Sequence, residues 1–307
     1  MSAIRERTVS RTFVKREFSI IGLLLIIYSL IVLFTPKAIL EYMIATGSVI
    51  LDNSYLYYGI YFIIVIIGTI VPFFVIRINS KLKAKKIFRG ANVKISELLV
   101  SSLVFFTVST ALVFATNIVA SYFGISGSLV TSIGFMLDDA DFFNPIYAFM
   151  FVLGSPLIEE YAFRGVLLNS LGKYGKRFAL YASAIIYALA HGSFLDMVPS
   201  FAMGLLLGKT TLRYKSFQPS LLIHILFNGL IYVSFIIPDI ASTYLIYVLA
   251  AIYLITIVLV LMRKYNRTVV LGSDNSREAI KLFYTNIPVI IAMAMMVIAS
   301  LMMVIPI

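Results

Sequence analysis

Nine apolar segments dominate this chain, and most of them approach the length of a membrane-spanning helix. A helix needs roughly 20 mostly apolar residues to cross the hydrocarbon core of a bilayer. The segments lie near residues 18–35, 55–77, 96–120, 145–171, 178–195, 199–213, 219–237, 245–263 and 285–306. Hydrophobic residues make up 61% of the 307 residues, more than a soluble core of this size needs. The sequence therefore predicts an all-α polytopic transmembrane helical bundle with eight to nine spans.

Two local features refine this expectation. The first segment follows a basic N-terminus but has no small-residue cleavage site after it and ends at Pro36, so we expect an uncleaved span. The sixth segment is short and contains Gly204 and Gly208, so it is either a half-span or begins earlier. The chain contains no cysteine, which excludes disulfides and thiolate metal ligands or nucleophiles.

Lysine and arginine residues are concentrated in every second loop, and this pattern predicts which side of the membrane each loop faces. Of the 25 lysines and arginines, all except Lys37 and Arg164 fall before the first segment or in every second loop after it. The intervening loops carry aspartate and glutamate. Cytoplasmic loops are enriched in Lys and Arg, so we expect a multi-pass cell-membrane protein with a cytoplasmic N-terminus. The net charge of +11 is then explained without nucleic acid, which we do not expect as a partner.

The chain divides into three parts that we expect to form one integrated membrane domain. Residues 1–95 form an N-terminal helical pair, 96–240 a central block with polar intramembrane residues, and 241–307 a C-terminal two-helix tail. The basic loop 78–95 is either a topogenic loop or a site for membrane lipid headgroups. The predicted external loop 124–144 holds three aspartates, which are either solvated or bind a divalent ion. We find no internal repeat.

The fourth apolar segment contains charges that need an explanation. Residues 155–164, Ser-Pro-Leu-Ile-Glu-Glu-Tyr-Ala-Phe-Arg, include two carboxylates and a guanidinium. Each such charge costs about 2.5–3.5 kcal/mol near the bilayer centre, so it is kept where it pairs or carries function. Glu160 and Arg164 are four residues apart and can form an ion pair on a helix. Glu159 lies about 100° round the helix, so we expect it to face another partner.

Both histidines of the chain also lie in apolar segments. His191 follows Tyr187 by one helical turn, and His224 precedes Asn228 by one turn, so each pair shares a helix face. A single intramembrane His or Asn commonly makes only a hydrogen bond between helices. Because small residues pack helices more cheaply, we expect the whole polar set to line one cavity in the central block.

The predicted helix ends place His191 and His224 at different depths in the membrane. A shared cavity therefore requires that these ends shift or that helices break. Pro156 can kink the fourth segment just before Glu159, because proline removes a backbone hydrogen bond.

Two chemistries suit this set of side chains. Glu159, His191, His224 and Asn228 could hold a divalent metal such as zinc. Alternatively, Glu159 and His191 activate a water while His224 and Asn228 donate hydrogen bonds to an oxyanion. Both lead to hydrolysis of an acyl bond. The motifs His-Glu-x-x-His and Gly-x-Ser-x-Gly are absent, so the sequence does not support a soluble-type zincin or serine hydrolase.

The three motifs Glu-Glu-x-x-x-Arg, aromatic-x-x-x-His and His-x-x-x-Asn, in this order over residues 96–240, resemble the CAAX-protease and bacteriocin-processing (CPBP, Abi) family. The resemblance implies that Glu159 is the catalytic base and that His191 helps to activate water. It also implies that Glu160 and Arg164 support the base, and that His224 and Asn228 stabilise the oxyanion or hold a metal. The family usually has Phe where this chain has Tyr187, a change that adds a hydroxyl to the ring.

The function predicted is therefore that of an intramembrane endopeptidase acting on a membrane-bound or lipidated peptide or protein. The alternative is a non-catalytic membrane scaffold that binds a cell-envelope protein, since some members of the family are membrane partners of such proteins. A transporter would be expected to show internal repeats, which are missing.

The topology has a direct test. Because basic loops stay in the cytoplasm, single cysteines in Lys85→Cys and Asp139→Cys variants should react from opposite sides of intact cells with a membrane-impermeant maleimide. The chain has no native cysteine, so the background is clean. Labelling of Lys85→Cys from outside would overturn the orientation.

Overall fold

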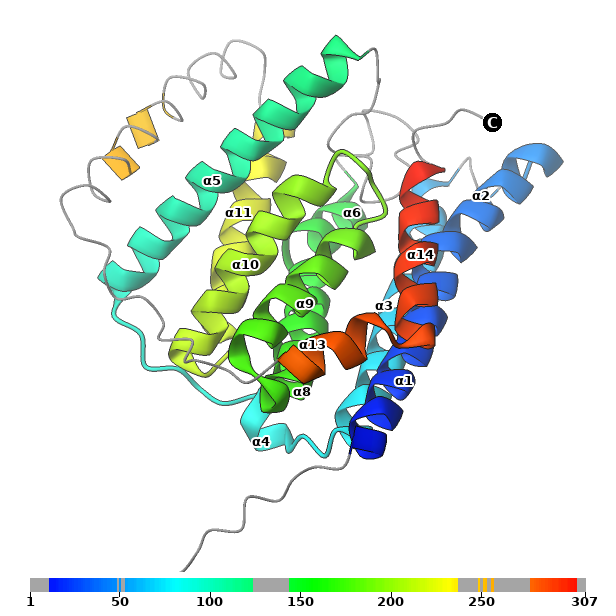
Figure 1. The fold of residues 1–307 in the computed structure, drawn as a ribbon. Helices are drawn as coiled ribbons and strands as arrows, with labels where there is room; N and C mark the ends of the chain where they lie inside the picture. Colours follow the sequence, from blue (N-terminus) through cyan, green and yellow to red (C-terminus); the bar gives the residue numbers. More distant parts are fainter. Residues whose placement is uncertain are drawn as a thin grey trace, which may run out of the picture.

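The computed structural model describes residues 11–48, 50, 53–123, 144–236, 248, 251–252, 255–256 and 277–302. Every regular element in these residues is a helix, and the helices form one bundle (Figure 1). The expected all-α membrane bundle is confirmed. The predicted external loop 124–144 lies outside the described residues except for Asn144, and the predicted span 245–263 lies outside them except for five positions.

Four continuous helices are long and apolar enough to cross a membrane, and a bent pair adds a fifth candidate among the described residues. The first runs from Arg11 to Thr46 through α1 (Arg11–Tyr28), a π-helical turn η1 (Ser29–Phe34) and α2 (Thr35–Thr46). The second is α3 (Ser54–Asn79), the third is α5 (Ile95–Tyr122) and the fourth is Pro145–Tyr174. The predicted count of eight to nine spans is not confirmed.

Three shorter helices follow in the central block. They are α9 (Lys176–Ala190), α10 (Met197–Tyr214) and α11 (Gln218–Ile236). The fifth predicted segment ends earlier than 195, because α9 stops at Ala190 and Gly192 takes a left-handed φ of 65°. The sixth begins slightly earlier than predicted. A Cβ on Gly204 of α10 would lie 3.0 Å from the Cα of Ala184 in α9, so this glycine lets the two helices approach closely.

The C-terminal helices pack on the N-terminal one. The short helix α13 (Arg277–Tyr284) meets α14 (Ile287–Leu301) at an angle of 64°. In Figure 1 the red α14 lies beside the blue α1. A Cβ on Gly22 would lie only 2.5 Å from the backbone nitrogen of Val289. The side-chain amide of Asn286, just before α14, donates a 3.0 Å hydrogen bond to the hydroxyl of Ser19.

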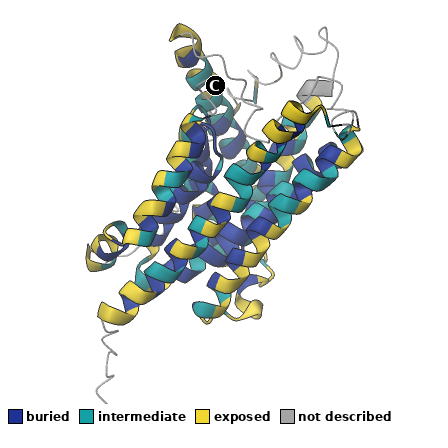
Figure 2. Ribbon diagram, turned by 90° about the vertical axis from the view of Figure 1, so that its right-hand side faces the viewer, coloured by how far each residue is buried: buried dark blue, intermediate teal, exposed yellow. Residues whose placement is uncertain are grey.

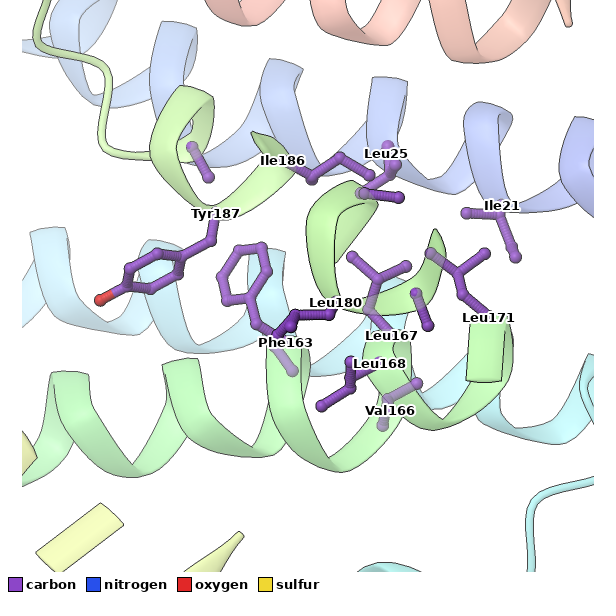
Figure 3. Packing of buried hydrophobic residues seen from close by; sticks show 14 of the residues in the cluster. Ile21, Leu25, Phe163, Val166, Leu167, Leu168, Leu171, Leu180, Ile186 and Tyr187 are labelled. Atoms are coloured by element: carbon purple, nitrogen blue, oxygen red, sulfur yellow. The ribbon is translucent and has the colours of Figure 1, made fainter. Parts of the chain in front are cut away.

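The core lies between α1, α9 and the second half of the Pro145–Tyr174 helix. Figure 3 shows ten labelled members of this cluster, including Leu25, Phe163 and Ile186. Figure 2 shows that buried residues concentrate on the inward faces of the helices and exposed ones on the outside. On α3, for example, Ile63, Ile67 and Val71 are exposed. An apolar outer face is expected where lipid is the solvent, because hydrocarbon is as apolar as these side chains.

One buried charge of α1 was not singled out in the sequence. Glu17 of α1 is 2% exposed and forms an ion pair with Lys173, and it also accepts a hydrogen bond from the hydroxyl of Tyr174. These partners lie at the end of the fourth long helix, in the single turn η6 (Gly172–Tyr174). Two elements far apart in the sequence are thereby held together at one end of the bundle.

Two glycine substitutions test the contact between α1 and α14. Gly22→Ala should lower stability by about 1–3 kcal/mol, because the new methyl meets backbone atoms that cannot move aside easily. Gly59→Ala in α3 is the matched control, since nothing lies within 4 Å of the added atom. It should be neutral or raise stability by up to about 1 kcal/mol. Thermal unfolding in detergent compares the two, and equal midpoints would contradict the close contact.

Candidate active site

The helix that carries the two adjacent glutamates changes its geometry twice. It begins with α6 (Pro145–Phe149), continues through the π-helical η4 (Met150–Gly154) and α7 (Ser155–Glu159), and becomes π-helical again in η5 (Glu160–Leu167). It ends with α8 (Leu168–Leu171) and η6. π-Helical turns inside α-helices are rare and occur frequently at functional sites. The predicted break near Pro156 is therefore a change in helix winding on both sides of α7.

The side chain of Asn228 compensates for the change in winding. The backbone N–H of Ser155 donates to the carbonyl of Met150, and Pro156 has no N–H to donate. The carbonyl of Phe151 would otherwise lack these helical partners. It accepts a 2.9 Å hydrogen bond from the side-chain amide of Asn228 in α11. A buried carbonyl is costly to leave unpaired, so this bond fixes α11 against the glutamate-bearing helix.

Glu160 is the centre of a buried charged contact. One of its carboxylate oxygens, Oε1, lies 2.9 Å from Nη1 of Arg164 and accepts a 3.1 Å hydrogen bond from Nδ1 of His224. The side chains of Glu160, Arg164 and His224 are 0%, 3% and 4% exposed. The guanidinium of Arg164 also lies over the ring of Tyr187, with 3.9 Å between Cζ and the ring centroid. The predicted Glu160–Arg164 pair is confirmed, and His224 joins it.

Glu159 has a different set of neighbours. The hydroxyl of Ser155, one turn earlier, donates a hydrogen bond to Oε1 of Glu159. The other oxygen, Oε2, is buried and makes no hydrogen bond of regular geometry among the described residues, as is also true of Oε2 of Glu160. The hydroxyl of Tyr187 lies near Glu159. His224, His191 and Arg164 are all close enough to interact electrostatically with this carboxylate. Glu159 therefore presents one unpaired oxygen within a positively polarised, buried environment.

His191 lies at the C-terminal end of α9, where its ring is oriented by the backbone. Its Nδ1 lies 2.7 Å from the carbonyl oxygen of Tyr187. A carbonyl only accepts, so Nδ1 carries the proton and Nε2 of the neutral ring is a free acceptor. The rings of His191 and Tyr187 also meet edge to face, 4.5 Å apart. The early end of α9 brings this histidine, expected at a different depth, into the range of Glu159.

Two further groups of this site were not assigned from the sequence. Ser155 holds Glu159, and the only sequence signal was its position four residues before that glutamate. The hydroxyl of Tyr187 is fully buried and lies near Glu159, but it makes no regular hydrogen bond with the described residues. The aromatic ring in the second motif thus brings a polar group into the site.

The predicted metal ligands do not converge as a metal site. In the part of the chain that the structure describes, no group of three or more His, Cys, Asp or Glu side chains is arranged to hold an ion. The Nδ1 atoms of His191 and His224 are held by protein acceptors, which leaves Nε2 of each ring as the atom that a metal would use. The possible metal stays a prediction, and we derive no chemical step through it.

Removing Arg164 should be far more damaging than removing the half-buried Arg213. Arg164→Ala leaves the carboxylate of Glu160 buried without its main counter-charge, which typically costs about 3–5 kcal/mol. Arg213→Ala is the control, because its ion pair with Glu97 is 27% exposed on both sides and should be worth about 0.2–1 kcal/mol. The double variant Glu160→Gln/Arg164→Met should lose less than Arg164→Ala alone. Thermal unfolding measures all three, and an unchanged midpoint for Arg164→Ala would show that the arginine is not part of a structural ion pair.

Comparisons with known proteins match the part of the chain that carries these residues. A family model described as type II CAAX prenyl endopeptidase Rce1-like matches residues 141–230, a range that contains all six predicted site residues. The membrane-embedded CAAX protease MroQ of Staphylococcus aureus (strain USA300) is 32% identical over 94 residues. This match covers 28% of the present chain and 38% of the relative. No solved structure matches. The central part of the chain, residues 141–230, is therefore similar to the CAAX-protease family of membrane proteins, and the match spans well under half the length of the curated relative.

Proposed function

We propose that this chain is an intramembrane endopeptidase that hydrolyses a peptide bond in a membrane-associated or lipidated peptide or protein. The observation that carries the proposal is the buried, unpaired Oε2 of Glu159 close to His191 and His224. A buried carboxylate oxygen without a partner is expensive, and the chain supplies Ser155 to orient it. The family match to proteases over the same residues supports this interpretation.

Glu159 and His191 have the properties of the groups that would activate water. In the proposed step, a water molecule next to Oε2 of Glu159 gives up a proton as it attacks the scissile carbonyl. Nε2 of His191 is the second free acceptor, because its Nδ1–H is held by the Tyr187 carbonyl. General base catalysis of this kind typically contributes about 10²–10⁴-fold in rate. The proton is then available for the leaving amine.

His224 and Asn228 are the groups we assign to the oxyanion. Glu160 accepts the Nδ1–H of His224 and so fixes the orientation of the imidazole ring. When its Nε2 also carries a proton, this ring can donate a hydrogen bond to developing negative charge. Asn228 uses one amide N–H for Phe151 and retains a second donor. Glu160 and Arg164 act in this scheme as positioning residues rather than as reactive groups.

The substrate class follows from where the site lies. The residues belong to helices in a membrane bundle, so a substrate must reach them from within or next to the lipid. The relative described above is named as a CAAX protease, which is consistent with a lipidated or membrane-bound substrate here. The cell membrane as location and the cytoplasmic N-terminus belong to the proposal, and the cysteine labelling above tests the orientation.

Replacing Glu159 distinguishes an enzyme from a scaffold. Glu159→Gln keeps the shape but removes the basicity, so proteolytic output should fall by about 10²-fold or more. Because the substrate is unknown, the measurement is mass spectrometry of peptide termini in membranes of a deletion strain that expresses wild type or variant at equal level. Peptide termini that appear only when the wild type is expressed should be absent from cells that express Glu159→Gln or His191→Ala.

Glu97→Gln provides the matched control, since it makes the same exchange in a glutamate that binds Arg213 and Tyr214 instead. Membranes of cells that express Glu97→Gln should contain the same peptide termini as membranes of cells that express the wild type. If Glu159→Gln and His191→Ala both yield the wild-type set, or fully complement the deletion phenotype, the chain is not a protease at this site and the scaffold is the better account.

A further inference from the structure

Five cationic side chains gather in the loop between α3 and α5, which we call the basic loop (residues 80–91). They are exposed, and none forms an ion pair with a carboxylate among the described residues; they are Lys81, Lys83, Lys85, Lys86 and Arg89. Both flanking helices are long and apolar enough to be membrane spans. The loop therefore lies at the level where lipid headgroups meet water.

Two apolar residues of the basic loop anchor it on the helix of the active site. Ile87, the last residue of the short helix α4 (Ala84–Ile87), is 1% exposed. It contacts η5 so closely that a Cβ on Gly165 would lie 3.1 Å from its Cγ2 atom. The ring of Phe88 stacks on Tyr161 of η5, with 6.0 Å between centroids and 15° between planes.

The same loop is attached to the start of the helix that carries His224. The ring of Phe88 meets Phe217 edge to face at 6.0 Å. The hydroxyl of Ser216 donates to the carbonyl of Arg89, and the N–H of Ala91 donates to the side-chain carbonyl of Gln218 at 3.3 Å. Gln218 is the first residue of α11. The basic loop thus bridges η5 and α11, the two elements that hold Glu160 and His224 together.

We propose that the basic loop is a binding site for anionic phospholipid headgroups and that binding there is transmitted to η5 and α11. Clusters of lysines next to a membrane span are attracted to anionic lipid, and this attraction acts within a Debye length of the surface. The unpaired cations supply the binding charge. The anchors Ile87 and Phe88 couple the backbone of the loop to the site. Headgroup binding is independent of whether the chain is a protease.

Spin-labelled lipids test the binding. The full chain is reconstituted in phosphatidylcholine with a trace of spin-labelled phosphatidylglycerol or phosphatidylcholine, and the motionally restricted fraction is measured. We expect a preference for phosphatidylglycerol of about twofold to fivefold that decreases with salt. Lys81→Gln/Lys83→Gln/Lys85→Gln/Lys86→Gln should remove most of it. The control Lys176→Gln/Lys209→Gln/Lys215→Gln, which neutralises exposed lysines elsewhere, should keep it.

If the wild type restricts spin-labelled phosphatidylglycerol and spin-labelled phosphatidylcholine to the same extent, the lipid site is overturned. The lysines would then serve only to set the topology of the loop. Loss of the preference in both lysine variants would likewise contradict a site at this loop. Inorganic phosphate added to the protein in phosphatidylcholine is the second arm. If phosphate alone displaced the labelled phosphatidylglycerol at low concentration, the loop would be a site for free anions instead.

Hydrogen exchange tests the transmission to the site without relying on proteolysis. Replacing phosphatidylcholine by a mixture with phosphatidylglycerol should slow amide exchange in peptides covering 160–167 and 218–224 in the wild type. Phe88→Ala keeps every cation but removes the stacked ring. It should still prefer phosphatidylglycerol, yet show no change in these peptides. An identical exchange response in Phe88→Ala would contradict the proposed coupling through this residue.

Discussion

The contact of Glu160 with Arg164 and His224 is the constraint on which the central block depends. Three polar side chains with almost no solvent exposure meet at one carboxylate oxygen inside a membrane bundle. Burying a charge in apolar surroundings is tolerated only where its partners are close and well oriented. The contact therefore fixes the position of α11 relative to η5, and it does so at the depth where the other polar residues gather.

The π-helical winding of the glutamate-bearing helix makes this arrangement possible. Pro156 cannot donate a backbone hydrogen bond, and the carbonyl of Phe151 is satisfied instead by Asn228. The same helix then changes winding again at Glu160. A helix with altered winding presents its side chains at angles that a regular α-helix does not. Glu159 and Glu160, adjacent in the sequence, accordingly have separate hydrogen-bond partners, Ser155 and His224.

The sequence predicted those features that depend on long apolar runs and on helical spacing. The spans 55–77 and 96–120 correspond to α3 and α5 because each run has the length that a bilayer requires. The Glu160–Arg164 pair follows from a spacing of four residues. The set of site residues could be proposed from the sequence because polar groups in apolar segments are conspicuous, whereas their catalytic roles remain predictions.

Features that depend on tertiary packing could not be predicted in this way. The predicted segment 178–195 runs past Ala190, whereas α9 ends there and Gly192 takes a left-handed φ. Glu17 was not singled out in the sequence, because its partners Lys173 and Tyr174 are more than 150 residues away in the chain. The predicted span count is not confirmed for the central block, where α9, α10 and α11 have 15, 18 and 19 residues and α9 and α10 pack closely at Gly204.

The protonation of the two histidines tests the account most directly. Because the chain contains only two, selective ¹⁵N labelling of histidine gives ring-nitrogen NMR signals that can be assigned with single His191→Gln and His224→Gln variants. The account predicts a proton on Nδ1 of both rings, a bare Nε2 on neutral His191, and a shift of the His224 signals alone in Glu160→Gln. A neutral His191 protonated on Nε2, or His224 signals unaffected by Glu160→Gln, would contradict it.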